Sequence, residues 1–228
     1  MRESEVKKEA AIELRVFGSF AKIEPLWASL EGWQDHPSLW PAWLSAMEET
    51  GCVAERKGWV PYHLGMFDGG ELLAAAPCYV KLNSEGEFIF DHGLARSAPR
   101  FGVDYFPKLL VASPFTPTNG PRLLVAKGKD PERARHVFAA ALASLTGELE
   151  VSSAHTLFLP EADAVSLADK GLLHRYSVQF HFTNPGFESY EDFLKTLPSK
   201  RRTKLRRERR YPSAHGITIE TETGDALT

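Results

Sequence analysis

Asp91 and His92 form the first pair whose side chains could do chemistry, because a carboxylate beside an imidazole can orient a general base. The pair ends the stretch EFIFDHG, which has the composition of a short strand. Adjacent side chains on a strand point to opposite faces, so the two would not meet as a dyad in an extended chain. A catalytic histidine and a structural histidine at a strand end both stay open.

The stretch Tyr105–Val125 offers a second group of polar side chains. An apolar run at 109–112 enters a loop that carries three prolines, and a second apolar run at 123–126 leaves it. Proline fixes φ and removes amide donors, so such a loop can hold one shape without a hydrogen-bonded ladder. A plain turn between two core strands is the alternative. If the loop forms a site, we expect a pocket lined by Asp91, His92, Lys108, Thr116, Thr118, Asn119 and Arg122.

Residues 200–210 contain eight Lys or Arg and a single acid, Glu208. A helix of this composition has no core-facing stripe, so it is either a solvated connector or a surface for a polyanion. Candidate polyanions are RNA, a phosphorylated lipid precursor and a nucleotide cofactor, although no RNA-binding sequence motif is present. The residues predicted to meet phosphates are Lys200, Arg201, Lys204 and Arg207.

Periodicity predicts the elements that hold these residues in the first part of the chain. Alternation at 12–17 indicates a strand, and two helical patterns follow, the second with Ser38 as a possible cap. The sequence Asp68-Gly69-Gly70 between apolar runs is a hairpin signal. Residues 62–91 therefore predict a three-stranded antiparallel meander, with Pro77 at an edge or bulge.

The second part predicts a β-α-β crossover. A strand at 109–111 precedes a helix that Asp130 caps and Pro131 opens, and a strand at 154–159 follows. A helix at 161–171 and a long alternating strand at 173–184 come next, and Ser189 begins a further helix. The fold class predicted is α/β with a mixed sheet, a meander plus a crossover, followed by a basic helical segment.

Composition is that of a globular protein: 43% of the 228 residues are hydrophobic, 25% are charged and the net charge is −3. Cys52 and Cys78 show neither disulfide nor zinc-ligand spacing, so no metal site is expected. The N-terminus lacks a secretory h-region, and no apolar run approaches the roughly 20 residues of a membrane span. We therefore expect a cytoplasmic protein.

Five blocks occur in order along the chain: GWVPYHLGMFDGGELLAAAPCYVK, FIFDHGLA, YFPKLLVASPFTPTNGPRLL, QFHFTN and SYEDFLKTLPSKRRTKLRRERR. With them the chain resembles bacterial proteins of the FemAB-like peptidoglycan biosynthesis/recognition family, within the GNAT acyltransferase superfamily. The resemblance implies two GNAT-like halves joined by a helical region. The polar composition of residues 1–11 predicts a flexible N-terminus, and the resemblance places the first GNAT-like domain at 12–184 and the basic helical connector at 185–215. Residues 216–228, where Ile217 and Ile219 suggest a strand, would begin a second half that this sequence does not complete.

The resemblance also implies a reaction, the transfer of an acyl or aminoacyl group from acyl-CoA or aminoacyl-tRNA to an amine in cell-envelope metabolism. A typical GNAT loop, Arg/Gln-x-x-Gly-x-Gly/Ala, cradles the pyrophosphate of acyl-CoA at a helix N-terminus. Here RLLVAKGKDPERA keeps Gly128 and Lys129 but not the pattern, and Pro131 removes an amide. This half is therefore expected to shape the acceptor site. The alternative function is a non-catalytic domain that recognises an envelope precursor or RNA through its basic helix.

Overall fold

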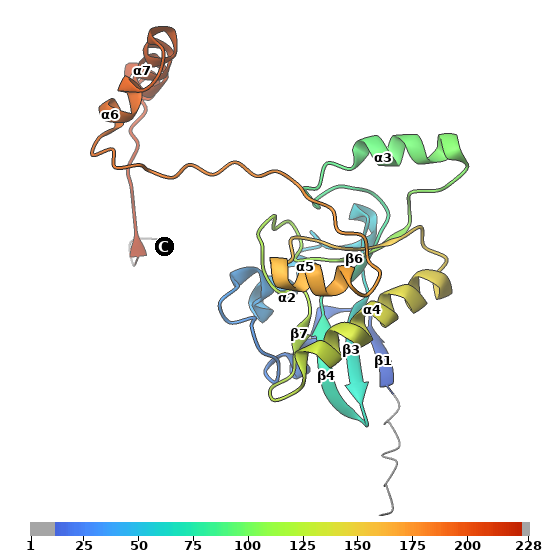
Figure 1. Cartoon of the computed structure of the whole chain (residues 1–228). Coiled ribbons are helices and arrows are strands. Elements are labelled where there is room, and N and C mark those ends of the chain that lie inside the picture. The colour runs from blue at the N-terminus through green and yellow to red at the C-terminus, as the bar shows by residue number, and fades with distance from the viewer. Residues whose placement is uncertain (1–11, 225–228) are drawn as a thin grey trace, which may run out of the picture. The chain divides into compact units, whose positions relative to one another are not determined.

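The computed structural model describes residues 12–224, and the chain divides into two compact units. The first unit ends at Ser177 and the second begins at Val178. The first holds all the strands of the described chain, and the second holds two helices (Figure 1). The domain boundary predicted after residue 184 stays a prediction.

The first of two sheets has the strand order β1-β3-β4-β7, with all neighbours antiparallel. Gly69 and Gly70, at φ 61° and 87°, turn the chain between β3 and β4, which confirms the predicted hairpin. These strands are β1 (Ile12–Phe17), β3 (His63–Asp68), β4 (Glu71–Ala76) and β7 (Leu124–Val125).

The second sheet has the order β2-β5-β6-β8 and contains one parallel pair, β6 with β8. Between β6 and β8 the chain forms β7 in the first sheet and then helix α4 (Pro131–Glu148), so the predicted β-α-β crossover between parallel strands is confirmed. Pro77 separates β4 from β5 at the point where the chain leaves one sheet for the other. The strands are β2 (Trp59–Pro61), β5 (Cys78–Lys81), β6 (Lys108–Val111) and β8 (Ala154–Thr156).

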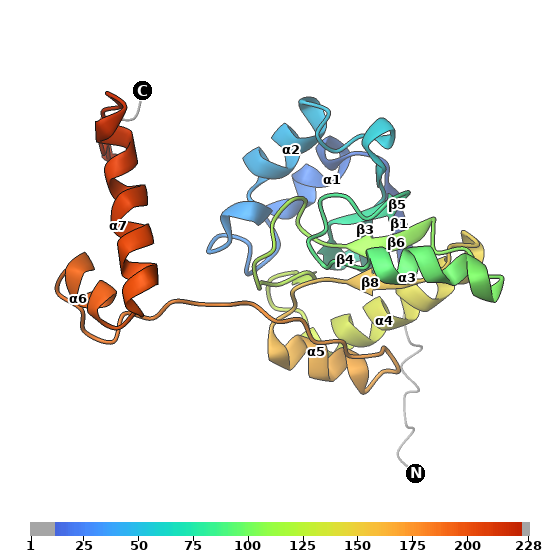
Figure 2. The same ribbon diagram turned by 90° about the horizontal axis from the view of Figure 1, so that it is seen from above.

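Helices cover both faces of the strands, with α1 and α2 on one side and α4 and α5 on the other (Figure 2). Along β4, Ala75 packs with α1, whereas Ala74 and Ala76 pack with α4. Along β6, Leu109 packs with α4 and Leu110 with the cluster around Trp59. Because both strands are buried on two faces, their sequences are continuous apolar runs rather than alternating ones.

The other elements are short. Asp130 accepts a hydrogen bond from the amide of Glu132, and Ser189 accepts one from the amide of Asp192, so both predicted caps are confirmed. Among the described residues, no helix is long and apolar enough to cross a membrane. The remaining helices are α1 (Phe20–Trp27), α2 (Pro41–Glu49), α3 (His92–Ser97), α5 (Glu161–Ala168), α6 (Tyr190–Lys195), α7 (Ser199–Ala214) and the 3₁₀ helices η1 (Pro37–Leu39), η2 (Glu55–Lys57) and η3 (Ala98–Phe101).

The predicted strand over EFIFDHG is wrong. Residues 87–90 are irregular, and Phe88 and Phe90 have φ values of 59° and 50°. A strand would hold the carboxylates of Glu87 and Asp91 about 13 Å apart. The turned backbone instead brings both to the ammonium group of Lys108. Of the predicted three-stranded meander only β3 and β4 pair with each other, because β5, the next strand, belongs to the second sheet.

Two other predicted strands are also absent from the described chain. Residues 173–183 and 217–221 have no regular secondary structure and no strand beside them. Alternation of apolar and polar residues does not make a strand unless a neighbouring strand hydrogen-bonds to its backbone. Ser38 does not cap α2. It lies in η1, and α2 begins after Trp40 with Pro41 at its first position.

Candidate functional site

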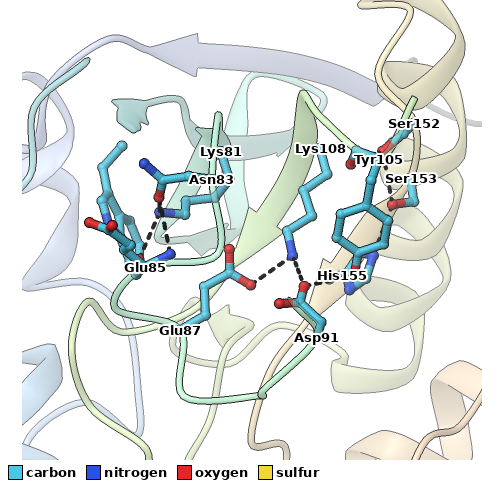
Figure 3. A network of polar contacts seen from close by, with 11 residues as sticks. Lys81, Asn83, Glu85, Glu87, Asp91, Tyr105, Lys108, Ser152, Ser153 and His155 are labelled. Atoms are coloured by element: carbon cyan, nitrogen blue, oxygen red, sulfur yellow. Dashed lines mark hydrogen bonds and ion pairs between the residues drawn. The ribbon is translucent and has the colours of Figure 1, made fainter. Parts of the chain in front are cut away.

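Three strand ends and one loop gather at one end of the second sheet (Figure 3). Lys81 ends β5 and Lys108 begins β6, and the antiparallel register pairs them directly. The parallel strand β8 begins at the same end, with Ala154 opposite Leu109. The loop between β5 and α3 brings its acidic side chains to this end of the sheet.

Lys108 is the centre of a fully buried ion-pair network. Its Nζ lies 2.8 Å from Oε2 of Glu87 and 2.6 Å from Oδ2 of Asp91, and none of the three side chains is exposed. Tyr105 donates a hydrogen bond of 2.7 Å to the same Oδ2 of Asp91. Desolvating three charges is costly, so the arrangement depends on each charge keeping its partners.

The two acids have opposite pKa shifts. Burial opposes ionisation of Asp91, but the hydrogen bonds from Lys108 and Tyr105 outweigh burial and lower its pKa to about 2. Burial dominates at Glu87 and raises its pKa, against the opposing effect of Lys108. Oε1 of Glu87 is buried and has no hydrogen-bond partner among the described residues. Asp91 is therefore a fixed anion, whereas Glu87 is the acid that more readily holds a proton.

Lys81 is the second buried lysine of this sheet end. Its Nζ lies 3.8 Å from the ring centroid of Trp59 and donates to the carbonyl of Glu85 at 3.0 Å. Trp59 Nε1 donates to the same carbonyl at 3.1 Å. Burial lowers the pKa of Lys81 from 10.5 to about 8. Both contacts fix the turn that leads to Glu87.

Tyr105, Ser153 and His155 form the half-buried side of the network. His155 Nε2 and Ser153 Oγ lie 2.8 Å apart, and the rings of His155 and Tyr105 meet edge to face at 6.4 Å. Burial, together with the charge of Lys108, lowers the pKa of His155 to about 4. The imidazole is therefore neutral at pH 7, and its unprotonated nitrogen can accept a hydrogen bond. Burial raises the pKa of Tyr105, which keeps its hydroxyl a hydrogen-bond donor.

The structure brings only part of the predicted pocket together. Asp91 and Lys108 are in contact, but His92 is exposed at the start of α3. The loop residues follow the other end of β6. Thr116 donates to the carbonyl of Pro114, and the remaining two polar side chains, Thr118 and Asn119, are exposed.

Arg122 is buried at the end of that loop, with 1% of its surface exposed. It donates to the carbonyls of Thr118 at 2.7 Å and Pro121 at 3.1 Å, and burial lowers its pKa to about 10. Its contacts to neutral carbonyls hold the proline-rich loop in shape. From this loop Phe115 reaches back to the network end, where its ring lies 5.4 Å from that of Trp59.

The four basic residues predicted to meet phosphates are exposed on α7 in the second unit. Lys204 lies 3.6 Å from Glu208, whereas Lys200, Arg201 and Arg207 make no ion pair within residues 12–224. Arg206 pairs with Glu191 at 2.5 Å, which ties α7 to α6. The exposed cations are thus not used to hold the second unit together.

The N-terminus of α4 does not fit the pyrophosphate of an acyl-CoA. The Asp130 carboxylate accepts the Glu132 amide at 3.0 Å, and Pro131 has no amide to offer. Glu132 adds a second acid in the first turn. Two carboxylates thus stand where a phosphate would need amide donors and positive potential.

Sequence reasoning missed Lys81, Glu87, Tyr105 and His155. The sequence signal that could have pointed to this network is the position of Lys81 and Lys108. Each adjoins an apolar strand, and a lysine beside a buried strand requires a charged or polar partner. Glu87 was hidden by its assignment to a strand. Within the described residues, no group of three His, Cys, Asp or Glu could hold a metal ion.

Comparison with known protein families agrees with the family resemblance of the sequence blocks. The model of the FemAB-like family, described as peptidoglycan biosynthesis/recognition, matches residues 19–228. None of the curated protein sequences compared with the chain matches it.

Two solved N-acetyltransferase structures are similar to the chain at low identity. One is the ribosomal-protein-alanine N-acetyltransferase from Brucella melitensis biovar Abortus 2308, with 12% identity, a TM-score of 0.42 and coverage of 76% of this chain and 100% of that one. The other is the aminoglycoside N-acetyltransferase AAC(6')-Iy in complex with CoA, with 13% identity, a TM-score of 0.41 and coverage of 78% and 98%.

Proposed function

Because the chain belongs to the FemAB-like family of peptidoglycan biosynthesis/recognition proteins, we propose that it is part of an N-acyltransferase that acts on an amine in cell-envelope metabolism. The observation that carries the proposal is the family match, which spans residues 19–228. The group transferred is acyl or aminoacyl, and the acceptor is a primary amine.

The network at the end of the second sheet supplies groups that such a transfer requires. An attacking amine must lose a proton, and His155 is a half-buried imidazole that is neutral at pH 7. The hydroxyl of Tyr105 donates its hydrogen to Asp91, so its oxygen can accept a hydrogen bond from the amine. In this proposal Asp91, Lys108 and Glu87 position Tyr105. His155 accepts a hydrogen bond from the unprotonated amine and takes its proton as the new bond to the acyl carbon forms, when that proton becomes acidic.

The direct test is mass spectrometry of the acceptor. A peptidoglycan stem peptide with a free side-chain amine is incubated with the chain and either acetyl-CoA or aminoacyl-tRNA. We expect a new amide on the peptide from one donor, and a loss of about 100-fold in rate with His155→Ala. His92→Ala, at an exposed position, is the matched control. Absence of transfer from both donors would contradict the proposal.

A separate experiment tests whether the N-terminus of α4 binds the acyl donor. If this half does not hold acyl-CoA at that helix, isothermal titration of acetyl-CoA into the folded chain gives no heat of binding. Binding that Asp130→Lys changes and Asp169→Lys leaves unchanged would assign the cofactor to α4 and overturn this part of the proposal. Asp169, just beyond α5, provides the same charge change away from α4.

A second candidate function rests on α7. Its unpaired cations support the non-catalytic alternative, in which the chain binds a polyanion such as tRNA or an anionic precursor. Replacing Lys200, Arg201, Lys204 and Arg207 by Glu is expected to abolish tRNA binding and its salt dependence. A matched control replaces four exposed bases of the first unit, Lys22, Arg56, Lys57 and Lys127. Equal affinity in wild type and the α7 variant would make α7 a connector only.

A further inference from the structure

The segment from Phe88 to Val103 displays large apolar side chains to solvent. Phe90 and Phe101 are 80% and 82% exposed, and Phe88, Leu94 and Val103 are 47–57% exposed. No residue of α3 or η3, all of them described, is buried. Core packing therefore does not explain why these side chains are apolar, and exposed groups of this kind mark interaction surfaces.

The backbone holds the two phenylalanines outward. Phe88 and Phe90 adopt left-handed φ values, which cost a non-glycine residue roughly 1–2 kcal/mol each. The acids on either side of them, Glu87 and Asp91, are buried against Lys108. The buried ion pairs thus anchor a strained loop whose exposed residues are aromatic, and strain of this kind is retained where it serves a function.

The charge of the segment indicates what it meets. Between residues 92 and 103 there is no acid, whereas Arg96 and Arg100 are exposed and make no ion pair within residues 12–224. Phenylalanine, leucine and valine beside unpaired arginines match the composition of helices that lie in the interface of an anionic bilayer. We call Phe88, Phe90, Leu94, Phe101, Val103, Arg96 and Arg100 the α3 surface.

We propose that the α3 surface docks on an anionic lipid bilayer, with its apolar side chains in the interface and its two arginines on lipid phosphates. Figure 1 shows α3 outside the packed layers of the first unit, joined to them by connections at both of its ends. Docking there would hold the Lys108 network, which anchors the same loop, close to the lipid surface. This inference does not depend on the N-acyltransferase proposal.

A depth-sensitive label separates docking by the α3 surface from adsorption by the basic helix α7. The full chain carries Cys52→Ser, because Cys52 is exposed and Cys78 is buried. An NBD fluorophore is placed at Leu94→Cys or, as control, at Val165→Cys, which is similarly exposed at 48% on α5. With phosphatidylglycerol vesicles we expect a blue shift and quenching by doxyl lipid at position 94 and neither at position 165.

Three outcomes would overturn the proposal. The first is no vesicle binding, and the second is co-sedimentation without a blue shift at position 94, the result of adsorption by α7 alone. The third is a blue shift that grows with protein concentration in the absence of vesicles, which would assign the α3 surface to contact between copies of the chain. An equal shift with neutral phosphatidylcholine vesicles would remove the anionic requirement and contradict the role of the arginines.

Substitutions give an independent measurement. The double variant Phe90→Ser with Phe101→Ser is expected to lower the partition coefficient onto phosphatidylglycerol vesicles about tenfold, because two aromatic side chains no longer leave water. Arg96→Gln with Arg100→Gln is expected to reduce the salt dependence of binding. Val165→Ser is the matched control. Unchanged partitioning of the phenylalanine variant would overturn the proposal. Because both positions are exposed, the substitutions should not unfold the protein, and a urea titration checks this.

Discussion

At the scale of single residues, the protein places its most costly charges at one end of the second sheet. Lys108 holds two buried acids and has no exposed surface, so each of the three charges depends on the others. Lys129 and Glu71 form an ion pair at the surface, where solvent screens both charges. The two lysines therefore differ in what their loss should cost.

Lys108→Met is expected to lower the free energy of unfolding by about 3–5 kcal/mol, because it leaves two buried carboxylates without a cation. Lys129→Met, the matched control, should change it by less than about 1 kcal/mol. Urea denaturation at pH 7 measures both. Equal losses in the two variants would show that the buried network contributes no more than a surface pair.

The lowered pKa of His155 predicts that the stability of the protein depends on pH. Its pKa falls from 6.5 to about 4 in the folded protein, so between these values the unfolded chain binds the proton and the folded chain does not. Stability is therefore lost as the pH falls from 6.5 towards 4, by about 2 kcal/mol between pH 7 and pH 5. His155→Gln should remove this part of the loss, and His92→Gln should not. Parallel pH profiles for wild type and both variants would contradict the low pKa.

At the scale of elements, the alternating stretch 173–183 is the clearest case of a pattern without a partner. Its large apolar side chains, Leu173, Tyr176, Val178, Phe180 and Phe182, are 71–99% exposed. No strand lies beside it in the described chain. A backbone amide outside any ladder exchanges with solvent freely.

Hydrogen exchange measured by mass spectrometry tests this element. Peptides covering 173–183 should exchange at the rate of an unstructured chain, whereas peptides covering β6 should be strongly protected, because β6 is bonded on both sides. Strong protection of 173–183 would mean that this segment pairs with a strand, in the same chain or in another copy.

At the scale of the whole molecule, the chain divides into two compact units between Ser177 and Val178, inside that irregular segment. Chymotrypsin cleaves after aromatic residues, and Tyr176, Phe180 and Phe182 are exposed there. Brief digestion is expected to cut first between residues 176 and 182 and to leave a folded fragment of the first unit. First cuts at the buried Phe20 or Phe138 would contradict the division into two units.

Elements whose signals are local can be predicted from the amino-acid sequence alone. The glycine turn between β3 and β4, the Asp130 cap of α4 and the Ser189 cap of α6 depend on residues within a few positions of one another, and all three are confirmed. The crossover from β6 through α4 to β8 followed from apolar runs of the right length. The family also followed from sequence blocks, which the match over residues 19–228 confirms.

The charged residues that contact one another are set by the three-dimensional fold. Glu87 and Asp91 reach Lys108 because the chain turns at Phe88 and Phe90. No local sequence pattern predicts that a phenylalanine adopts a left-handed backbone conformation. The same fold buries the side chain of Asp91, leaves that of His92 exposed and places the proline-rich loop at the other end of β6. Contacts between residues distant in sequence carry no periodicity, so a site that is built from them is set by packing and charge pairing in three dimensions.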